Sequence, residues 1–368
     1  MDPREYTAYF NYMMTRFLGR SLVGPGMFSE RGLAFVRGLG LVWVALGLGC
    51  VIGMPTMGFW TLLLFDLFLA CDALHAGILA LHNHAWNRAA KRDFDKNILV
   101  LANAMPYTLQ GDSGTAILFI HGFGDTPETW QLVAPRVHSL ANATCRAMRL
   151  PFAATTLRRQ HHAHLGDWLA AIRDEAADLR RCHEKVFIAG QGMGAGLALL
   201  AACEDPKLAD GVVVFSPVVR AKRASKILFW LADHFCVFTR VVPNPCRGVI
   251  RTQDGRAYSY ARDPFVAFAA FRAFFQMTRR LVAAQARSAA GLRRRLPVLA
   301  FVSSRDRLVD IPAAMRFLDG ADILDGADVY TSRKAGHALT LDVDWEKRAA
   351  RTAAFAPPYF FLTRTSRM

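Results

Sequence analysis

The stretch between residues 186 and 202 places the strongest constraint on the fold of this chain. Its apolar residues 186–189 lead into three glycines, Gly190, Gly192 and Gly194, and an apolar segment rich in Ala and Leu follows. A short apolar run bounded by glycine is typical of a buried strand, and glycine permits the positive φ angles of a tight turn. The stretch therefore predicts a strand, a sharp turn and a helix, which is a building unit of α/β proteins.

The same alternation continues along most of the chain after residue 97. Short apolar runs alternate with amphipathic segments, which predicts a mostly parallel sheet with helices on both faces. The expected strands are residues 98–101, 115–120, 145–150, 185–189, 211–215, 297–301 and 327–330. The expected helices are residues 127–140, 166–181, 194–202, 311–317 and 345–354. Asp125 or Thr126 is expected to cap the first helix, with Pro127 at its first position.

One long segment, residues 217–295, breaks the alternation. We expect it to form a mostly helical cap on an α/β domain that spans residues 97–368. Phe268, Phe271 and Phe275 recur at helical spacing, which places them on one face of a helix. That face either packs into the core or forms an acyl-chain groove or a membrane-facing lid.

The cap segment also carries most of the chain's net charge of +15. Residues 220–295 contain sixteen Lys and Arg against three acidic residues. Such a patch attracts anionic lipid headgroups or nucleic acid, or it is a solvated face without a partner. Because aromatic residues interleave it and an apolar N-terminal region precedes it, we expect an anionic membrane surface, and no nucleic acid, as its partner.

The N-terminal region, residues 1–96, is expected to anchor the chain in a membrane. Residues 38–65 contain no charged side chain, and a Gly and a Pro divide this apolar run. Since a span needs about 20 apolar residues, two helices fit, at 33–53 and 57–81. Basic residues flank the pair and the turn between the helices is uncharged, which predicts an inner or plasma membrane protein whose large domain lies on the cytoplasmic side.

Three ionisable residues, Asp66, Asp72 and His75, interrupt the second span. Ionisable groups are costly in lipid, so they normally face protein or water. Either the membrane ends near Asp72 and the helix continues as a stalk, or these side chains form a polar seam against a membrane-protein partner or the large domain.

The seven cysteines are scattered and form no C-x-x-C pair. This pattern favours a reducing compartment without disulfides or structural zinc. The histidines in the run 161–164 are interpreted as part of a solvated loop rather than as a metal site. No metal and no cofactor are therefore expected.

Four short motifs come in a fixed order, each after an expected strand or turn. They are His-Gly-Phe-Gly at 121–124, Gly-Gln-Gly-Met-Gly at 190–194, the stretch 303–310, which contains Asp306, and the stretch 335–342, which contains His337. The second motif has the form of a G-x-S-x-G nucleophile elbow with Gly192 in the serine position. An acid and a histidine then follow in the chain order nucleophile, acid, base.

These motifs resemble those of the α/β-hydrolase superfamily, and within it the monoacylglycerol lipases and related bacterial carboxylesterases, over residues 107–351. The resemblance implies an α/β-hydrolase fold and hydrolysis of a lipid-like acyl ester through a serine acyl-enzyme. It implies that His337 is the general base and that Asp306 orients it, with Asp310 as a competing acid. No cofactor is implied.

The resemblance also assigns the remaining site residues. The backbone N–H groups of Phe123 and Met193 match the donors of an oxyanion hole, which must be preorganised around the developing charge. Four neighbours are expected to bind substrate: His121, Gly122, Gly124 and Gln191. One departure from the family is the stretch 150–153, which lacks a Gly-His-Gly-type turn, so the substrate wall there is not carried over.

The main departure is Gly192, because glycine offers no nucleophile. Glycine also relieves the backbone strain of an elbow, which costs a larger residue roughly 1–3 kcal/mol. Three explanations stay open: a deliberate replacement that traps substrate, a natural pseudoenzyme that binds lipid or a partner as a scaffolding module, or direct activation of water by the His337–Asp306 pair. In each case we expect little acyl-enzyme turnover.

Overall fold

The structure, a computed structural model, describes residues 94–95, 100–101, 104–155, 157–160, 162–220, 241–243, 265–288, 296–320 and 324–356. All of them belong to the unit Leu81–Met368. The two expected membrane spans, 33–53 and 57–81, lie outside the described residues, as does most of the cap segment. Among the helices that are described, none combines the length and the apolarity that a bilayer crossing requires.

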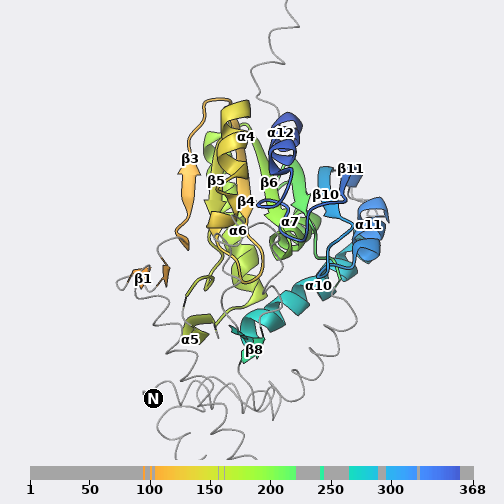
Figure 1. Cartoon of the computed structure of the whole chain (residues 1–368). Helices are drawn as coiled ribbons and strands as arrows, with labels where there is room; N and C mark the ends of the chain where they lie inside the picture. Colours follow the sequence, from red (N-terminus) through yellow and green to blue (C-terminus); the bar gives the residue numbers. More distant parts are fainter. Residues whose placement is uncertain are drawn as a thin grey trace, which may run out of the picture. The chain divides into compact units, whose positions relative to one another are not determined.

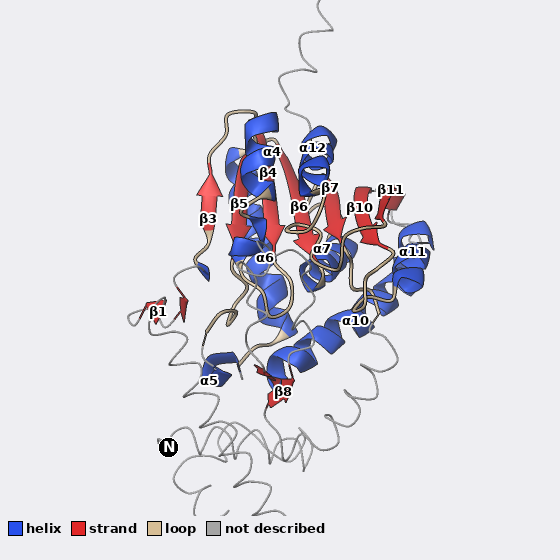
Figure 2. Ribbon diagram, viewed as in Figure 1, coloured by secondary structure: helices blue, strands red, loops and turns tan. Residues whose placement is uncertain are grey.

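A seven-stranded sheet forms the centre of the domain, in the spatial order β11-β10-β7-β6-β4-β5-β3 (Figure 2). Its strands are β3 (Tyr107–Leu109), β4 (Thr115–Ile120), β5 (Thr144–Met148), β6 (Lys185–Gln191), β7 (Gly211–Phe215), β10 (Leu296–Ser303) and β11 (Leu324–Ser332). Every neighbouring pair is parallel except β3 with β5 at one edge. This arrangement is the expected mostly parallel sheet.

Helices cover both faces of the sheet (Figure 1). The helices are η2 (Pro127–Trp130, a 3-10 turn), α4 (Val133–Ala141), α5 (Leu157–Gln160), α6 (Leu165–Cys182), α7 (Met193–Glu204), α10 (Phe268–Ser288), α11 (Ile311–Gly320) and α12 (Trp345–Phe355). Ile117 and Phe119 of β4 pack toward α4 and α12, whereas Leu118 and Ile120 pack in the cluster that contains α6, α7 and α10. Because both faces are covered, the strands consist of continuous apolar runs rather than alternating ones.

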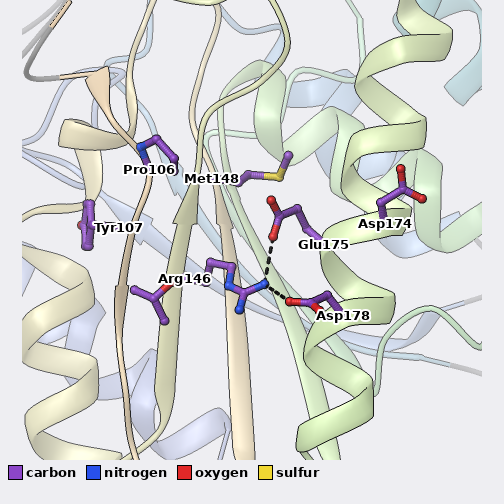
Figure 3. Close-up of a pocket in the computed structure, with 8 residues that line it drawn as sticks. Pro106, Tyr107, Arg146, Met148, Asp174, Glu175 and Asp178 are labelled. Atoms are coloured by element: carbon purple, nitrogen blue, oxygen red, sulfur yellow. Dashed lines mark hydrogen bonds and ion pairs between the residues drawn. The ribbon is translucent and has the colours of Figure 1, made fainter. Parts of the chain in front are cut away.

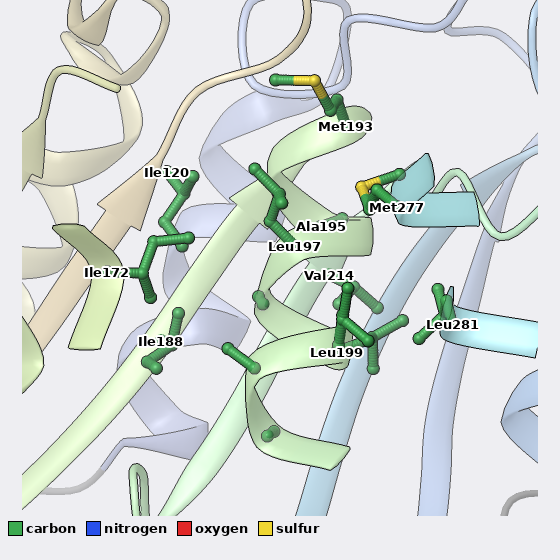
Figure 4. Close-up of a cluster of buried hydrophobic side chains, with 14 of the residues drawn as sticks. Ile120, Ile172, Ile188, Met193, Ala195, Leu197, Leu199, Val214, Met277 and Leu281 are labelled. Carbon is green, nitrogen blue, oxygen red and sulfur yellow. The ribbon is translucent and has the colours of Figure 1, made fainter. Parts of the chain in front are cut away.

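Helix α7, which follows the turn at Gly192, is deeply buried. Its residues from Met193 to Ala202 are all buried, and Leu197 and Leu199 lie among side chains of the sheet and of α10 (Figure 4). A Cβ atom at Gly190 or Gly194 would overlap backbone atoms, so glycine allows α7 to approach the sheet this closely. The elbow therefore rests on a tightly packed foundation.

Several elements differ from the sequence-based expectation. The strand expected at 98–101 does not join the main sheet: β2 (Val100–Leu101) pairs antiparallel with β1 (Phe94–Asp95). The edge strand β3 was not expected, because its three residues are too few to give a periodic signal. The mostly helical cap segment includes a small antiparallel pair, β8 (Val241–Pro243) with β9 (Phe265–Ala267), before α10 begins.

The helix expected at 127–140 is divided into η2 and α4. The Thr126 hydroxyl accepts a hydrogen bond from the Glu128 N–H, so the cap is Thr126 rather than Asp125. The tighter 3-10 turn places the fully buried Trp130 against Phe119, with 4.8 Å between the ring centroids.

Candidate active site

Gly192 forms the sharp turn between β6 and α7. Its backbone angles are φ 57° and ψ −110°, a conformation that a side chain makes costly. Its N–H donates to the Phe215 carbonyl at 2.8 Å, and its carbonyl accepts from the amides of Gly196 and Val218 at 3.2 and 3.1 Å. The turn thus has the sharp elbow geometry that the motif predicts, and backbone hydrogen bonds fix it on both sides.

His337 lies on the loop after β11 and is directed at the elbow. Its Nδ1 is 2.7 Å from Oδ2 of Asp306, and its Nε2 would be 2.9 Å from a Cβ atom placed on Gly192. Asp310, the competing acid, instead accepts the Ala313 N–H and begins α11. The structure therefore brings Gly192, Asp306 and His337 together, with the imidazole so close to residue 192 that a side chain there would require His337 to move back.

The Asp306 carboxylate is held in its ionised form. Burial alone raises its pKa, but the charge and hydrogen bond of His337 and the amides of Val309 and Leu308 outweigh burial and hold the pKa at about 2. These amides donate to Oδ1 at 3.0 and 2.8 Å, while Oδ2 faces His337. An acceptor of this kind keeps the Nδ1 proton on the imidazole and leaves Nε2 facing Gly192.

The backbone of the His337 loop is held by two buried side chains, Asp342 of the loop itself and Arg348 of α12. Asp342 accepts the Gly336 N–H at 2.6 Å. Arg348 of α12 donates to the carbonyls of Leu339 and Asp342 at 2.7 and 2.9 Å and also to that of Val343. Burial lowers the pKa of Arg348 to about 10, against the charges of Asp342, Asp344 and Glu346, so it remains a cation. The loop is a rigid support for the imidazole.

Gln191, which was expected to bind substrate, directs its side-chain amide at the His337 loop. Its side chain is 2 % exposed, and its Nε2 donates to the His337 carbonyl at 2.9 Å. The residue before the elbow therefore connects β6 to the His337 loop. The motif alone could not show this, because side chains alternate between the two faces of a strand and only the assembled sheet decides what each face meets.

A small cavity lies beside the elbow, with about 40 Å³ of space for water-sized molecules. Phe123 and Met193, whose amides are the expected oxyanion donors, both line it, together with Gly122 and Gly124. The other walls are mainly apolar and come from Leu150, Pro151, Phe152, Ala153, Ala154, Ala163, Trp168 and Ala270. Phe123 also contacts Phe274 of α10, with ring centroids 5.4 Å apart, which closes one side of the cavity.

His121 lines this cavity, but its polar atoms are directed elsewhere. Its Nδ1 donates to the Gly122 carbonyl at 2.9 Å, and its Nε2 accepts the Leu150 N–H at 3.1 Å. Burial lowers its pKa to about 4, so the ring is neutral near pH 7. The His121 ring therefore joins the oxyanion loop to the end of β5, and the expected substrate-binding role of this residue stays a prediction.

Asp125 is a second carboxyl group at the site, which the sequence analysis treated only as a helix cap. It lines the cavity, and its Oδ1 accepts the Thr126 N–H at 2.9 Å. Burial raises its pKa to about 6, although the amide of Thr126, the hydroxyl of Thr129 and the charge of His337 all oppose that rise. The electrostatic effect of His337 shows that both carboxyl groups act on one imidazole.

The loop after β5 forms a strained wall of the cavity. Phe152 and Ala154 have φ angles of 66° and 55°, which are rare for residues with a side chain. Two side chains hold the carbonyls of the loop: Trp168 Nε1 of α6 donates to Pro151 at 3.1 Å, and Arg149 of the loop itself donates to Ala153 at 3.0 Å. Strain of this kind concentrates at functional sites, and this is the stretch where the sequence departs from the family pattern.

A second, larger cavity of about 460 Å³ lies between β3, β5 and α6 (Figure 3). Its centre is Arg146, which bonds to Glu175 and Asp178 at 3.0 and 2.5 Å. It shares no lining residue with the cavity beside the elbow. Within the described ranges, no group of three or more His, Cys, Asp or Glu side chains is placed to hold a metal ion, here or elsewhere.

Comparison with known families agrees with this geometry. The family model described as serine aminopeptidase, S33 (Hydrolase_4) matches residues 112–344, which is more than half of the chain. The chain belongs to this S33 family of α/β-hydrolases. The matched region contains all four motifs and every residue of the elbow, the acid loop and the His337 loop.

Individual relatives of this S33-family chain are distant. A monoglyceride lipase homolog of monkeypox virus is 22% identical over 249 residues, which cover 64% of this chain and 86% of that protein. A solved structure of a metagenome-derived lipolytic enzyme (LipS or LipT) has a TM-score of 0.61 at 20% identity, covering 70% of this chain and 98% of its own. A soluble variant of the monoglyceride lipase of Saccharomyces cerevisiae, solved with a substrate analog, has a TM-score of 0.58 at 15% identity, covering 68% and 89%. At these identities the solved structures establish the fold.

Proposed function

We propose that this chain is a membrane-tethered acyl-ester hydrolase by architecture, with a lipid-like acyl ester as its substrate class and with very low turnover because residue 192 is glycine. In the parent reaction a serine at the elbow attacks the ester carbonyl, His337 accepts its proton and Asp306 orients the imidazole. The amides of Phe123 and Met193 stabilise the oxyanion. The relatives named as monoglyceride lipases support this substrate class.

One observation carries the proposal. An imidazole held by an ionised carboxylate at 2.7 Å is aimed at Gly192, the residue in the nucleophile position, which has no side chain. Buried side chains also fix the backbone around this histidine: Gln191 bonds to the His337 carbonyl, Asp342 to the Gly336 N–H and Arg348 to the Leu339 carbonyl. A histidine without a role at the elbow would not need this support. The base is preorganised, and only the attacking oxygen is absent.

The test is to restore that oxygen. Gly192→Ser is expected to raise hydrolysis of a short-chain p-nitrophenyl ester by at least about 100-fold over the parent chain, since nucleophile and base act as one unit. The rate of Gly192→Ser should stay below that of a natural serine hydrolase for two reasons. His337 must move away, because its Nε2 would be only 2.9 Å from the new Cβ, and a residue with a side chain is strained at these backbone angles.

Two controls make the result specific. Gly192→Ala introduces the same backbone strain without a nucleophile and should leave the rate at the parent level. Gly192→Ser combined with His337→Ala should lose the gain. A rise in rate that survives His337→Ala, or no rise in a folded Gly192→Ser chain, would reject the assignment of the site.

We also propose that residues 33–53 and 57–81 cross the membrane and that the domain faces the cytoplasm, where the basic segment 220–295 lies against anionic lipid. The uncharged stretch 38–65 and the basic residues that flank the two spans support this topology. The chain should remain in the membrane pellet after alkaline carbonate extraction, and protease added to sealed inside-out vesicles should digest the domain. Protection of the domain in those vesicles would reverse the topology.

A further inference from the structure

Two buried threonine hydroxyls connect the oxyanion loop to the His337 loop, and no motif assigns them a role. Thr129 of η2 and Thr340, which follows His337 by three residues, are both fully buried, and their Oγ1 atoms are 3.2 Å apart. The Thr129 hydroxyl also hydrogen bonds to the Asp125 carboxyl group. We infer that Asp125, Thr129 and Thr340 form a hydrogen-bond chain that positions the His337 loop against the oxyanion loop, a role that rests on the hydrolase site proposed above.

The local geometry of η2 brings Thr129 back to Asp125. In a 3-10 turn, side chains three residues apart lie one above the other. The Thr129 N–H donates to the Thr126 carbonyl at 3.1 Å, and the Thr126 N–H donates to Oδ1 of Asp125 at 2.9 Å. Thr129 therefore lies in line with the residue that follows Asp125, which explains why its hydroxyl reaches this carboxyl group.

The Asp125 end of the chain lies on the oxyanion loop. A Cβ atom placed on Gly122 would be 3.8 Å from Oδ2 of Asp125 and 3.9 Å from its Cβ. The Asp125 side chain therefore folds back onto the residue that precedes Phe123, whose N–H is an expected oxyanion donor. A contact of this kind fixes the turn that carries that donor.

The Thr340 end of the chain lies in the turn directly after the imidazole. The Leu339 N–H donates to the His337 carbonyl at 2.9 Å, so the backbone folds back at once and keeps Thr340 close to His337. Gln191 of β6 holds the same carbonyl at 2.9 Å. The bond between Thr340 and Thr129 adds an attachment to η2, so the loop is held from two separate parts of the domain.

The three groups act as one unit because each hydroxyl serves two neighbours. An ionised carboxylate can only accept, so the Thr129 hydroxyl donates to Asp125 and its oxygen accepts from the Thr340 hydroxyl. Bonds in such a chain polarise one another, and in a buried place water does not replace a lost partner. Removal of one hydroxyl therefore weakens the whole connection between the two loops.

Catalysis at this site needs the two loops in a fixed relation. One loop carries an oxyanion donor and the other carries the base, and a misplacement of about 1 Å between reacting groups can cost about 100-fold in rate. Thr129 and Thr340 are 211 residues apart in the sequence, so only tertiary contacts set the distance between their loops. Neither threonine lines the cavity beside the elbow, so both act as positioning residues.

The first experiment measures kcat and KM for a short-chain p-nitrophenyl ester in the full-length Gly192→Ser chain, with each threonine changed in two ways. Valine keeps the shape and removes the hydroxyl, whereas serine keeps the hydroxyl and removes the methyl group. Thr129→Val and Thr340→Val should each lower kcat about tenfold and leave KM within about twofold. Thr129→Ser and Thr340→Ser should keep most of kcat. A packing role predicts the reverse order, and that result would overturn the inference.

Combined variants test whether the groups form one chain. Thr129→Val with Thr340→Val should be no slower than either change alone, within about twofold, because either one breaks the same connection. Asp125→Leu removes the last acceptor, so it should also lower kcat and add no further loss to Thr340→Val. Thr352→Val is the control, since this buried hydroxyl bonds only within α12, and it should leave kcat unchanged. Losses that multiply in the combined variants would overturn the chain.

The parent chain supplies a measurement that needs no turnover. The proton of His337 Nδ1, which faces Asp306 Oδ2 at 2.7 Å, should give a low-field signal in proton NMR. Thr340→Val should shift or broaden this signal, whereas Thr340→Ser and Thr352→Val should leave it in place. A signal that both valine variants leave unchanged would overturn the positioning role.

The two proposals fail separately. If the valine variants move the His337 signal while Gly192→Ser stays inactive, the positioning role stands and the hydrolase assignment is wrong. If Gly192→Ser is active and the valine variants change neither its kcat nor the signal, the hydrolase assignment stands and the hydrogen-bond chain has no positioning role.

Discussion

Two carboxyl groups act on the same imidazole from different loops, and their surroundings shift their pKa values in opposite directions. Asp306, after β10, receives two backbone amides and His337, which bring its pKa to about 2 despite burial. Asp125, after β4, accepts the Thr126 amide and the Thr129 hydroxyl, and burial raises its pKa to about 6. The difference lies in the number and charge of the donors, since burial alone raises both pKa values.

The two carboxyl groups therefore differ in their charge near neutral pH. The acid loop maintains a permanent negative charge, which keeps the imidazole in the tautomer that faces Gly192. The oxyanion loop holds a group that gains and loses its proton near neutral pH.

The largest expected effect comes from removing the permanent charge. Asp306→Asn should lower the free energy of unfolding by about 2.4 kcal/mol at pH 7, because a carboxylate with a depressed pKa stabilises the folded chain at every pH above its unfolded value. That contribution is present above about pH 4 and is lost as the pH falls through about 2.

Chemical denaturation followed by tryptophan fluorescence between pH 7 and pH 3 tests this. The curves of the parent and Asp306→Asn should approach each other as the pH falls below 4. Asp310→Asn is the control. The difference in unfolding free energy between this variant and the parent should not shrink as the pH falls below 4. A gap between Asp306→Asn and the parent that is constant with pH would remove the distinction between the two carboxyl groups.

The opposite sign is expected for Asp125. The folded chain retains this proton up to about pH 6, whereas the unfolded chain releases it near pH 4, so folding stability falls as the pH rises through that window. Asp125→Asn, which keeps an oxygen acceptor for Thr126, should therefore be about 2 kcal/mol more stable than the parent at pH 7.5 and nearly equal to it at pH 4. The same denaturation series measures both values. An Asp125→Asn chain less stable than the parent at pH 7.5 would contradict this account.

The smallest effect concerns the hydroxyl that supports Asp125. Thr129 is fully buried, its Oγ1 is 3.2 Å from Oγ1 of Thr340 on the His337 loop, and it also hydrogen bonds to Asp125. Thr129→Val should cost about 1 kcal/mol, the usual net value of a buried hydrogen bond. Thr352→Val is the matched control, because the Thr352 hydroxyl bonds only to the Arg348 carbonyl of its own helix. Equal costs for the two changes would mean that Thr129 has no particular role at the site.

The sequence predicted most of the sheet because parallel strands are buried on both faces and therefore appear as continuous apolar runs. Strands β4 and β7 have the predicted limits, and β6 ends two residues later than predicted. No apolar run marks the short edge strand β3, and no sequence pattern indicates that the first helix is divided into η2 and α4. Their conformations depend on neighbours distant in the chain, such as Phe119 and Phe215 around Trp130.

The order of the four motifs likewise indicated which residues would meet, and the structure places Gly192, Asp306 and His337 within contact. The same motifs did not indicate the direction of each side chain. His121 and Gln191 lie inside two of them, yet both ring nitrogens of His121 and Nε2 of Gln191 hydrogen bond to backbone groups. Arg348 lies outside every motif and still holds the His337 loop, because helix α12 brings it there.

The sequence by itself determined the order of strands and turns, the glycine at the elbow and the types of residue that surround it, since these follow from local apolar runs, glycine and spacing. Only the tertiary structure decided which carboxyl group stays charged, which ring nitrogens are free to act and how much space a ligand has. Those properties depend on burial and on hydrogen-bond donors contributed by residues far apart in the chain, so no local pattern encodes them.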